Sequence, residues 1–241
     1  METSFLLLWF EAPLQSWGAD SKFGRRDSLN FPTKSGVLGL LLCALGATGE
    51  QKELLERLAP LKQTAISYVR TIIKKNNTVD KEDREPLLMD FHMVGSGYDN
   101  DDFWQSLLIP KKSDGSSAVG GGAKMTYRYY LQDAKFAVLL EIPNDLSATF
   151  SNALINPVYD IYLGRKNCVP TDFVYRGTFE NENDAFVQAD QIAKEKNLVE
   201  DFRVLHGEFF EQGNILTLND IPVQFGEIKR YRDRRVTIIE K

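Results

Sequence analysis

The residues with the clearest chemistry stand at the start of an apolar stretch, Phe31 to Gly46, where a threonine, a lysine and a serine precede a run of aliphatic side chains. Thr33 suits the cap of a helix, since its hydroxyl can accept a hydrogen bond from a free backbone N–H of the first turn. The other free N–H groups and the positive end of the helix dipole attract anions. Lys34 and Ser35 add a charge and a donor there, so this turn predicts a phosphate contact. The chain lacks the full spacing of a P-loop.

Basic residues also gather in two other places, although the formal net charge of the chain is -5. Arg25 and Arg26 precede the apolar stretch together with Lys22, and a second group lies in the tail from Lys229 to Lys241. The segment from Glu180 to Asp201 is acidic. A negative chain can therefore present a basic groove backed by an acidic face, and the groove would suit the phosphates of a nucleic acid. Arg25 and Arg26 complete the predicted set of phosphate contacts.

Aromatic rings and a cation form a second candidate contact. Tyr127 and Arg128 stand at the entry to a strand, and such groups stack on bases in sheets that bind RNA. Because alternate residues of a strand face inward, we expect one of Tyr127 and Tyr129 to belong to the core.

The loop from Tyr162 to Pro170 is a third candidate. Gly164 has no side chain to keep a ligand away from the backbone, and Arg165 and Lys166 follow it with two cations. The loop therefore predicts a further contact with a nucleic acid, with a plain surface turn as the alternative.

Evidence for catalysis is slight. His92 could deprotonate a 2′-hydroxyl in metal-free RNA cleavage, whereas His206 has no suggestive neighbours. Paired carboxylates, a nucleophile elbow and metal-ligand spacing are all missing from the sequence. Two cysteines, Cys43 and Cys168, make neither a disulfide framework nor a zinc site. We expect no catalytic residue, no cofactor and no bound metal.

The order of the predicted elements indicates an α+β fold. Phe5 to Phe10 is apolar at every position, which is typical of a central strand covered on both faces. The segment from about Asn76 to Met125 is predicted as an elongated hairpin with flexible parts. The resulting βαββαβ order fits a ferredoxin-like sheet, of which the RRM is the RNA-binding version. The other predicted elements are helices at Lys34–Ala47, Gln51–Leu58 and Asn144–Leu154, and strands at Thr64–Ile73 and at Lys135–Ile142, whose even-numbered residues share one face.

The pattern changes near residue 156, which predicts two domains. Residues 1–156 would form the RRM-like domain, with the hairpin inserted at about 76–126, and residues 157–241 a smaller β-rich domain. No apolar run reaches the roughly 18 residues of a membrane span, and no basic leader precedes Phe5. We therefore expect a cytoplasmic protein without membrane contact. The strands predicted for the second domain are Phe173–Phe179, Arg203–Phe210, Ile215–Leu218 and Val236–Ile239.

Four blocks of this sequence resemble the CasD family, the subunit of the type I-E CRISPR Cascade complex that holds the 5′ handle of the guide RNA. The blocks are Ala12–Gly18, Phe31–Leu41, Thr126–Phe136 and Tyr162–Cys168, in the order that the family has them. The resemblance implies an RRM-like N-terminal domain, a thumb formed by the long hairpin, and a β-rich C-terminal part.

The same resemblance implies a non-catalytic RNA-binding subunit in antiviral defence. Its partners would be the crRNA 5′ handle, the Cascade backbone subunits and the large subunit, and target DNA would be reached only through the assembled complex. The alternative is a metal-independent endoribonuclease that processes CRISPR precursor RNA, as a subunit of the same fold does in type I-C relatives, with His92 as its base. The predicted RNA-binding residues are Arg25, Arg26, Lys34, Ser35, Tyr127, Arg128, Gly164, Arg165 and Lys166.

Overall fold

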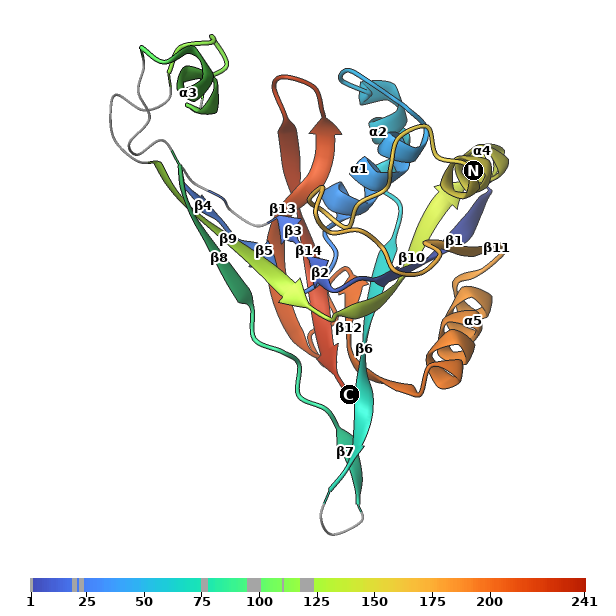
Figure 1. Ribbon diagram of the computed structural model, residues 1–241. Helices are drawn as coiled ribbons and strands as arrows, with labels where there is room; N and C mark the ends of the chain where they lie inside the picture. The colour runs from blue at the N-terminus through green and yellow to red at the C-terminus, as the bar shows by residue number, and fades with distance from the viewer. Residues whose placement is uncertain are drawn as a thin grey trace.

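An antiparallel sheet forms the centre of the computed structural model, which describes residues 2–18, 21, 24–74, 78–94, 101–109, 111–117 and 124–241. Its strands are β1 (Thr3–Glu11), β6 (Gln63–Ile73), β7 (Val79–Lys81), β10 (Lys135–Pro143), β11 (Tyr175–Phe179), β12 (Leu198–His206), β13 (Asn214–Gln224) and β14 (Arg230–Glu240). In the described residues these eight strands have the order β11-β1-β10-β6-β12-β14-β13, with β7 paired to β6 (Figure 1). The helices described are α1 (Lys34–Ala44), α2 (Lys52–Leu58), α3 (Phe103–Leu108), α4 (Asn144–Ile155) and α5 (Glu182–Glu195). The chain therefore has a mixed α/β fold.

Strand β1 lies inside the core, as predicted. All six side chains from Phe5 to Phe10 are buried. The even-numbered ones pack in one cluster with α1 and α4, and the odd-numbered ones pack in a second cluster with α5. β10 pairs along the whole of β1 and divides its side chains between the same two clusters, which confirms the predicted faces of that strand.

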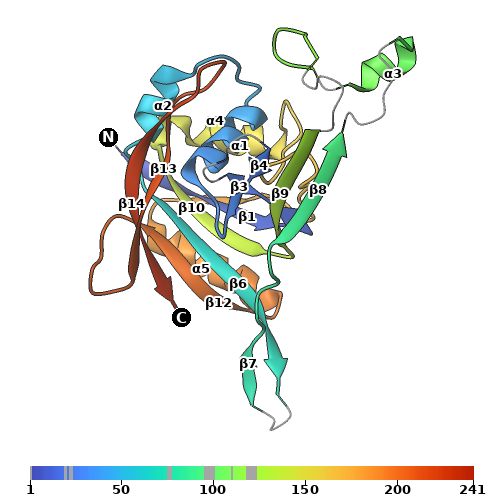
Figure 2. The ribbon, with the colours of Figure 1, turned by 90° about the vertical axis from the view of Figure 1, so that its left-hand side faces the viewer.

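Helix α5 is a difference from the sequence-based expectation, which assigned no element to the acidic segment Glu180 to Asp201. Its buried residues recur at helical spacing, and they cover the sheet opposite α1 and α4 (Figure 2). Three of the four are alanines, so the stripe is only weakly apolar and is hard to recognise within an acidic segment. The buried residues of α5 are Ala185, Ala189, Ile192 and Ala193.

The strands from the second half of the chain join the main sheet, where β13 and β14 are longer than predicted, β12 begins and ends earlier, and β11 is two residues shorter. β11 pairs with β1, and β12 pairs with β6. The sheet therefore continues across the boundary expected near residue 156, and a division into two domains at that point stays a prediction. Among the helices that the structure describes, none is long and apolar enough to cross a membrane.

A smaller sheet extends away from this body. It contains β2 (Leu14–Gln15), β4 (Arg25–Arg26), β8 (Leu88–Val94) and β9 (Lys124–Gln132), with β9 at its centre. β8 and β9 form an antiparallel ribbon that leads toward α3 (Figure 2), in the segment where an elongated hairpin was expected. A short pair, β3 (Trp17–Gly18) and β5 (Ser28–Leu29), lies nearby. The expected glycine-rich piece at 120–122 and the cation Lys22 lie outside the described residues.

Candidate nucleic-acid interface

The first turn of α1 has the expected cap, but an internal carboxylate lies at its free N–H groups. The hydroxyl of Thr33 accepts a hydrogen bond from the N–H of Gly36 at 3.2 Å. The N–H of Lys34 donates to Oδ2 of Asp220 at 2.8 Å, and Arg234 donates to both oxygens of this carboxylate at 2.7 and 2.9 Å. The position that favours an anion is therefore already taken by a side chain of β13.

The ammonium group of Lys34 corrects a prediction. The side chain is fully buried, and its Nζ donates to the carbonyls of Ala59, at 2.7 Å, and Leu61. Burial, with the nearby charge of Arg234 as a smaller cause, lowers the pKa of Lys34 to about 7. An amine held in this way has no access to the phosphates of a polymer, so Lys34 does not belong to the exposed surface.

Ser35 lies beside a groove between the start of α1 and the β13–β14 hairpin. The groove has a volume of about 780 Å³. Two cations line it, Arg26 from β4 and Lys229 from the basic tail, so the fold brings together two basic groups that the sequence keeps apart. Asp220 and Asp233, from the same hairpin as Lys229, also line the groove.

Arg25 and Arg26 are exposed and lie beside β9, as neighbours of two other predicted residues. β4 runs parallel to β9, with Arg25 opposite Tyr127 and Arg26 opposite Arg128. Nε of Arg25 donates to both carboxylate oxygens of Asp27 at 2.9 and 3.0 Å. Three arginines and an aromatic ring, Arg25, Arg26, Arg128 and Tyr127, therefore adjoin from distant segments at one place, which we call the β4–β9 junction.

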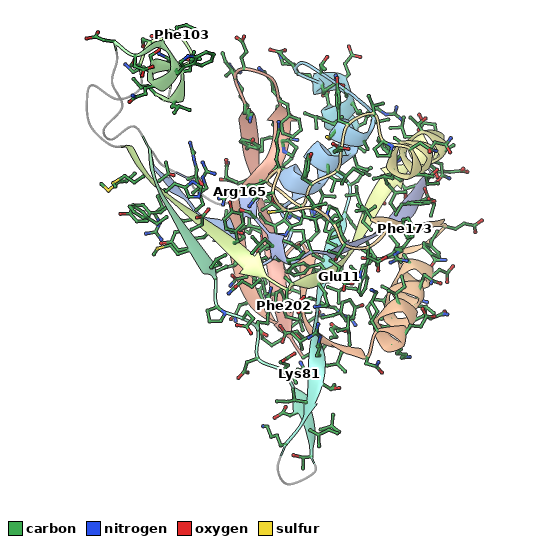
Figure 3. All side chains as sticks on the ribbon, viewed as in Figure 1. Glu11, Lys81, Phe103, Arg165, Phe173 and Phe202 are labelled. Atoms are coloured by element: carbon green, nitrogen blue, oxygen red, sulfur yellow. The ribbon has the colours of Figure 1, made fainter. Side chains whose placement is uncertain are left out.

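Arg165 holds this junction from the side of the body (Figure 3). Its guanidinium donates to the carbonyls of Tyr129, at 3.2 Å, and Arg26, at 2.9 Å. It also lies 4.6 Å from the ring centroid of Tyr130. These two hydrogen bonds fix β4 against β9. Arg165 is half-buried, whereas its neighbour Lys166 is exposed.

The backbone conformation and the close surroundings of residue 164 require a glycine, which could not be seen from the sequence alone. Its φ is +102°, and a Cβ at this position would lie 1.7 Å from the carbonyl oxygen of Ser16. The glycine is therefore required by a close approach of two protein segments, and its predicted role as an opening for a ligand stays a prediction.

Tyr127 and Tyr129 also differ from the prediction. Residues two apart in a strand share a face, so the rings of Tyr127 and Tyr129 lie on the same face of β9, and neither ring is buried. Tyr130 belongs to the opposite face and is only 2% exposed. The prediction that one of the pair belongs to the core is wrong, because β9 has left the body here and no layer covers that face. Sequence reasoning also missed Phe91, which lies opposite Tyr127 with ring centroids 5.1 Å apart.

His92 lies beside an acidic residue of its own strand. Its Nε2 lies 2.7 Å from Oδ2 of Asp90 in the same strand. The other histidine, His206, is in the interior, where burial and then the charge of Lys34 lower its pKa to about 4. Within the described residues, no group of three or more histidine, cysteine or acidic side chains could hold a metal ion.

Comparisons with known proteins agree with one another. A family model described as CRISPR-associated protein (Cas_Cas5) matches residues 5–237. The CRISPR system Cascade subunit CasD of Escherichia coli (strain K12) is 29% identical to the chain over 178 residues, which are 73% of this chain and 71% of that protein. One chain of a solved CRISPR RNA-guided surveillance complex has a TM-score of 0.67 at 24% identity, covering 98% of this chain and 90% of its own. A second solved structure, of a Cas protein, has a TM-score of 0.56 at 24% identity, covering 98% and 94%. These matches confirm the family resemblance predicted from the four sequence blocks.

Proposed function

The chain belongs to the Cas5 family of CRISPR-associated proteins, and from this premise we propose that it is a non-catalytic RNA-binding subunit of a Cascade surveillance complex. The RNA segment that it holds is the 5′ handle of the guide RNA. The observation that carries this proposal is the β4–β9 junction, where exposed cations and aromatic rings from distant segments adjoin. A single-stranded nucleic acid is bound by this combination of charge and stacking surface.

The proposal includes a finer description of the fold, a ferredoxin-like and RRM-like domain with the β8–β9 ribbon as its thumb. β1, α1, β6, β10, α4 and β11 follow one another as βαββαβ. Their strands have the order β11-β1-β10-β6, in which the first strand lies between the fourth and the third, as in a ferredoxin-like sheet. In an RRM the sheet face without helices stacks on bases. Here α5 buries that face, so RNA must bind elsewhere.

Four cations are the phosphate contacts that we propose: Arg25, Arg26, Arg128 and Lys166. The ion pair of Arg25 with Asp27 is no obstacle, because the arginine side chain is 63% exposed and exposed pairs contribute little in water. Tyr127 lies beside these cations as the base contact, and Ser35 faces the adjoining groove.

Assembly into the complex is the second part of the proposal. The partners are the Cascade backbone subunits and the large subunit, in the cytoplasm, and target DNA is reached only through the assembled complex. Helix α3 supports contacts with protein neighbours, because Phe103, Trp104, Leu107 and Leu108 are all more than half exposed on it and such apolar patches mark interaction sites.

The test replaces Arg25 and Arg26 together by alanine and measures binding of guide RNA carrying the 5′ handle at several salt concentrations. Each lost phosphate contact on a single strand reduces the slope of log K against log salt by about 0.7, so we expect weaker binding and a slope shallower by about 1.4. The matched control is Lys62→Ala with Lys194→Ala, which removes two exposed charges elsewhere. An unchanged slope in the Arg25 and Arg26 variant would contradict the proposed contacts.

The rival function is that of an endoribonuclease, and the His92–Asp90 contact is the observation in its favour. The two functions are separated by incubating the pure protein with CRISPR repeat RNA in EDTA. We expect intact RNA. A specific cut that is lost in His92→Ala would establish the rival.

A further inference from the structure

We propose that one face of the β8–β9 ribbon is a stacking platform for unpaired bases of the bound RNA, with Phe91 and Tyr127 at its centre. This inference rests on the proposed function, because it assumes that RNA crosses the β4–β9 junction. It goes further because it assigns a surface that contacts the bases of the RNA, whereas the arginines of the proposed function contact only its phosphates.

The platform consists of three cross-strand pairs. Phe91 lies opposite Tyr127, and the flanking pairs are Met89 with Tyr129 and Met93 with Met125. Since side chains of a strand alternate between its faces, these odd-numbered residues share one face, and polar Asp90 and His92 belong to the other. The hydroxyl of Tyr129 donates to the sulfur of Met89 at 3.4 Å, which fixes the two strands at one end of the platform.

The rings at the centre are arranged to receive another flat group. The planes of Phe91 and Tyr127 meet at 40°, with centroids 5.1 Å apart, so the pair does not close on itself as a full stack. Phe91 is 48% exposed and Tyr127 is 36% exposed. Their free faces expose apolar surface, which becomes favourable once a base covers it.

Charge favours a nucleic acid over a protein as the occupant. The guanidinium of Arg25, which is in register with Tyr127, lies 5.0 Å from the ring centroid of Tyr129. Arg26, in register with Arg128, continues the same edge of β9 toward the other face. A strand of RNA has this layout, with phosphates on one side and bases on the other. An apolar protein segment would leave these cations without complementary charge.

The main sheet offers no alternative platform in the described residues. Three aromatic rings on its second face, those of Phe5, Trp9 and Tyr68, are buried in the cluster that α5 covers. The ribbon therefore takes the base-stacking role that the open sheet face has in an RRM.

The experiment is a double-mutant cycle between Phe91→Ala and removal of single bases from the handle RNA, with the full chain as the protein. Phe91→Ala should weaken binding of intact RNA by about 5- to 100-fold, the range of one stacked base, while the salt slope stays that of the wild type. One abasic position should weaken wild-type binding by a similar factor and should leave Phe91→Ala binding unchanged. Phe91→Trp should restore affinity. The control is Phe173→Ala, because Phe173 is 80% exposed and lies on the body (Figure 3).

Three results would overturn the platform. The first is a loss of RNA affinity in Phe91→Ala that is no greater than the loss in Phe173→Ala. The second is an equal loss of affinity in Phe91→Ala with every abasic RNA, which would show no coupling to a base. The third is normal RNA binding by Phe91→Ala with a failure to enter the complex, which would assign the face to a protein neighbour. A wild-type chain that does not bind intact handle RNA would overturn the proposed function as well, and that result is distinct because it needs no substitution.

Discussion

At the scale of single residues, the start of α1 is neutralised from within the protein. The carboxylate of Asp220 accepts hydrogen bonds from the N–H of Lys34 and from Arg234. A negative group at a helix N-terminus stabilises the helix, and this one also joins α1 to β13. The same site is therefore structural, and the RNA contacts that we propose are the exposed Arg25 and Arg26.

The buried amine of Lys34 predicts a particular pH dependence of stability. Its pKa is about 7 in the folded chain, against 10.5 ordinarily. Between these values the unfolded chain binds a proton that the folded chain does not, so this group increases stability as the pH rises. The free energy of unfolding of the wild type should rise relative to that of Lys34→Met by on the order of 1.4 kcal/mol per pH unit. Urea denaturation of both proteins at about pH 7.5 and about pH 9.5 measures this change. A gap that does not change with pH would contradict the assignment.

At the scale of elements, the 162–170 loop is linked to the segment around Ser16, to β4 and to β9, so that these pieces form one unit. Ser16 donates its N–H to the carbonyl of Leu163, Gly164 makes room for the carbonyl of Ser16, and Arg165 bonds to both β4 and β9. The loop thereby sets where the exposed arginines lie relative to the ribbon.

Gly164→Ala tests this unit. The added methyl group would collide with the Ser16 carbonyl at a positive φ, so stability should fall by more than the roughly 1–3 kcal/mol of backbone strain alone. RNA affinity should also fall, because Arg165 is displaced. Gly49→Ala is the matched control, since its φ is +79° with open space around it. Equal losses of stability in thermal or chemical unfolding would contradict the steric explanation.

Local patterns explain which elements the sequence predicts. β1, α1 and β10 are apolar runs with clear alternation or helical spacing, and each is found within a few residues of its expected bounds. Helix α5 was not predicted from the sequence, because alanines form most of its buried stripe. The burial of Lys34 could not be predicted, because the carbonyls that accept from its ammonium group, those of Ala59 and Leu61, lie 25 and 27 residues away in the sequence.

At the scale of the whole molecule, both faces of the central strands are covered, and the β8–β9 ribbon leaves the body (Figure 2). Arg25, Arg26 and Tyr127 adjoin at the β4–β9 junction. The net charge of -5 therefore does not oppose RNA binding. Acidic residues of α5 lie on the side of the sheet opposite α1, away from the junction.

Photo-crosslinking tests the central claim most directly. Guide RNA with photoreactive nucleotides in its 5′ handle would be assembled into the complex and irradiated, and the modified peptides of this chain identified by mass spectrometry. We predict crosslinks at β4 and on the β8–β9 ribbon, around Arg25 and Tyr127, and none on α5. Crosslinks confined to α5 or to other surfaces of the main sheet, with the junction unmodified, would contradict the account.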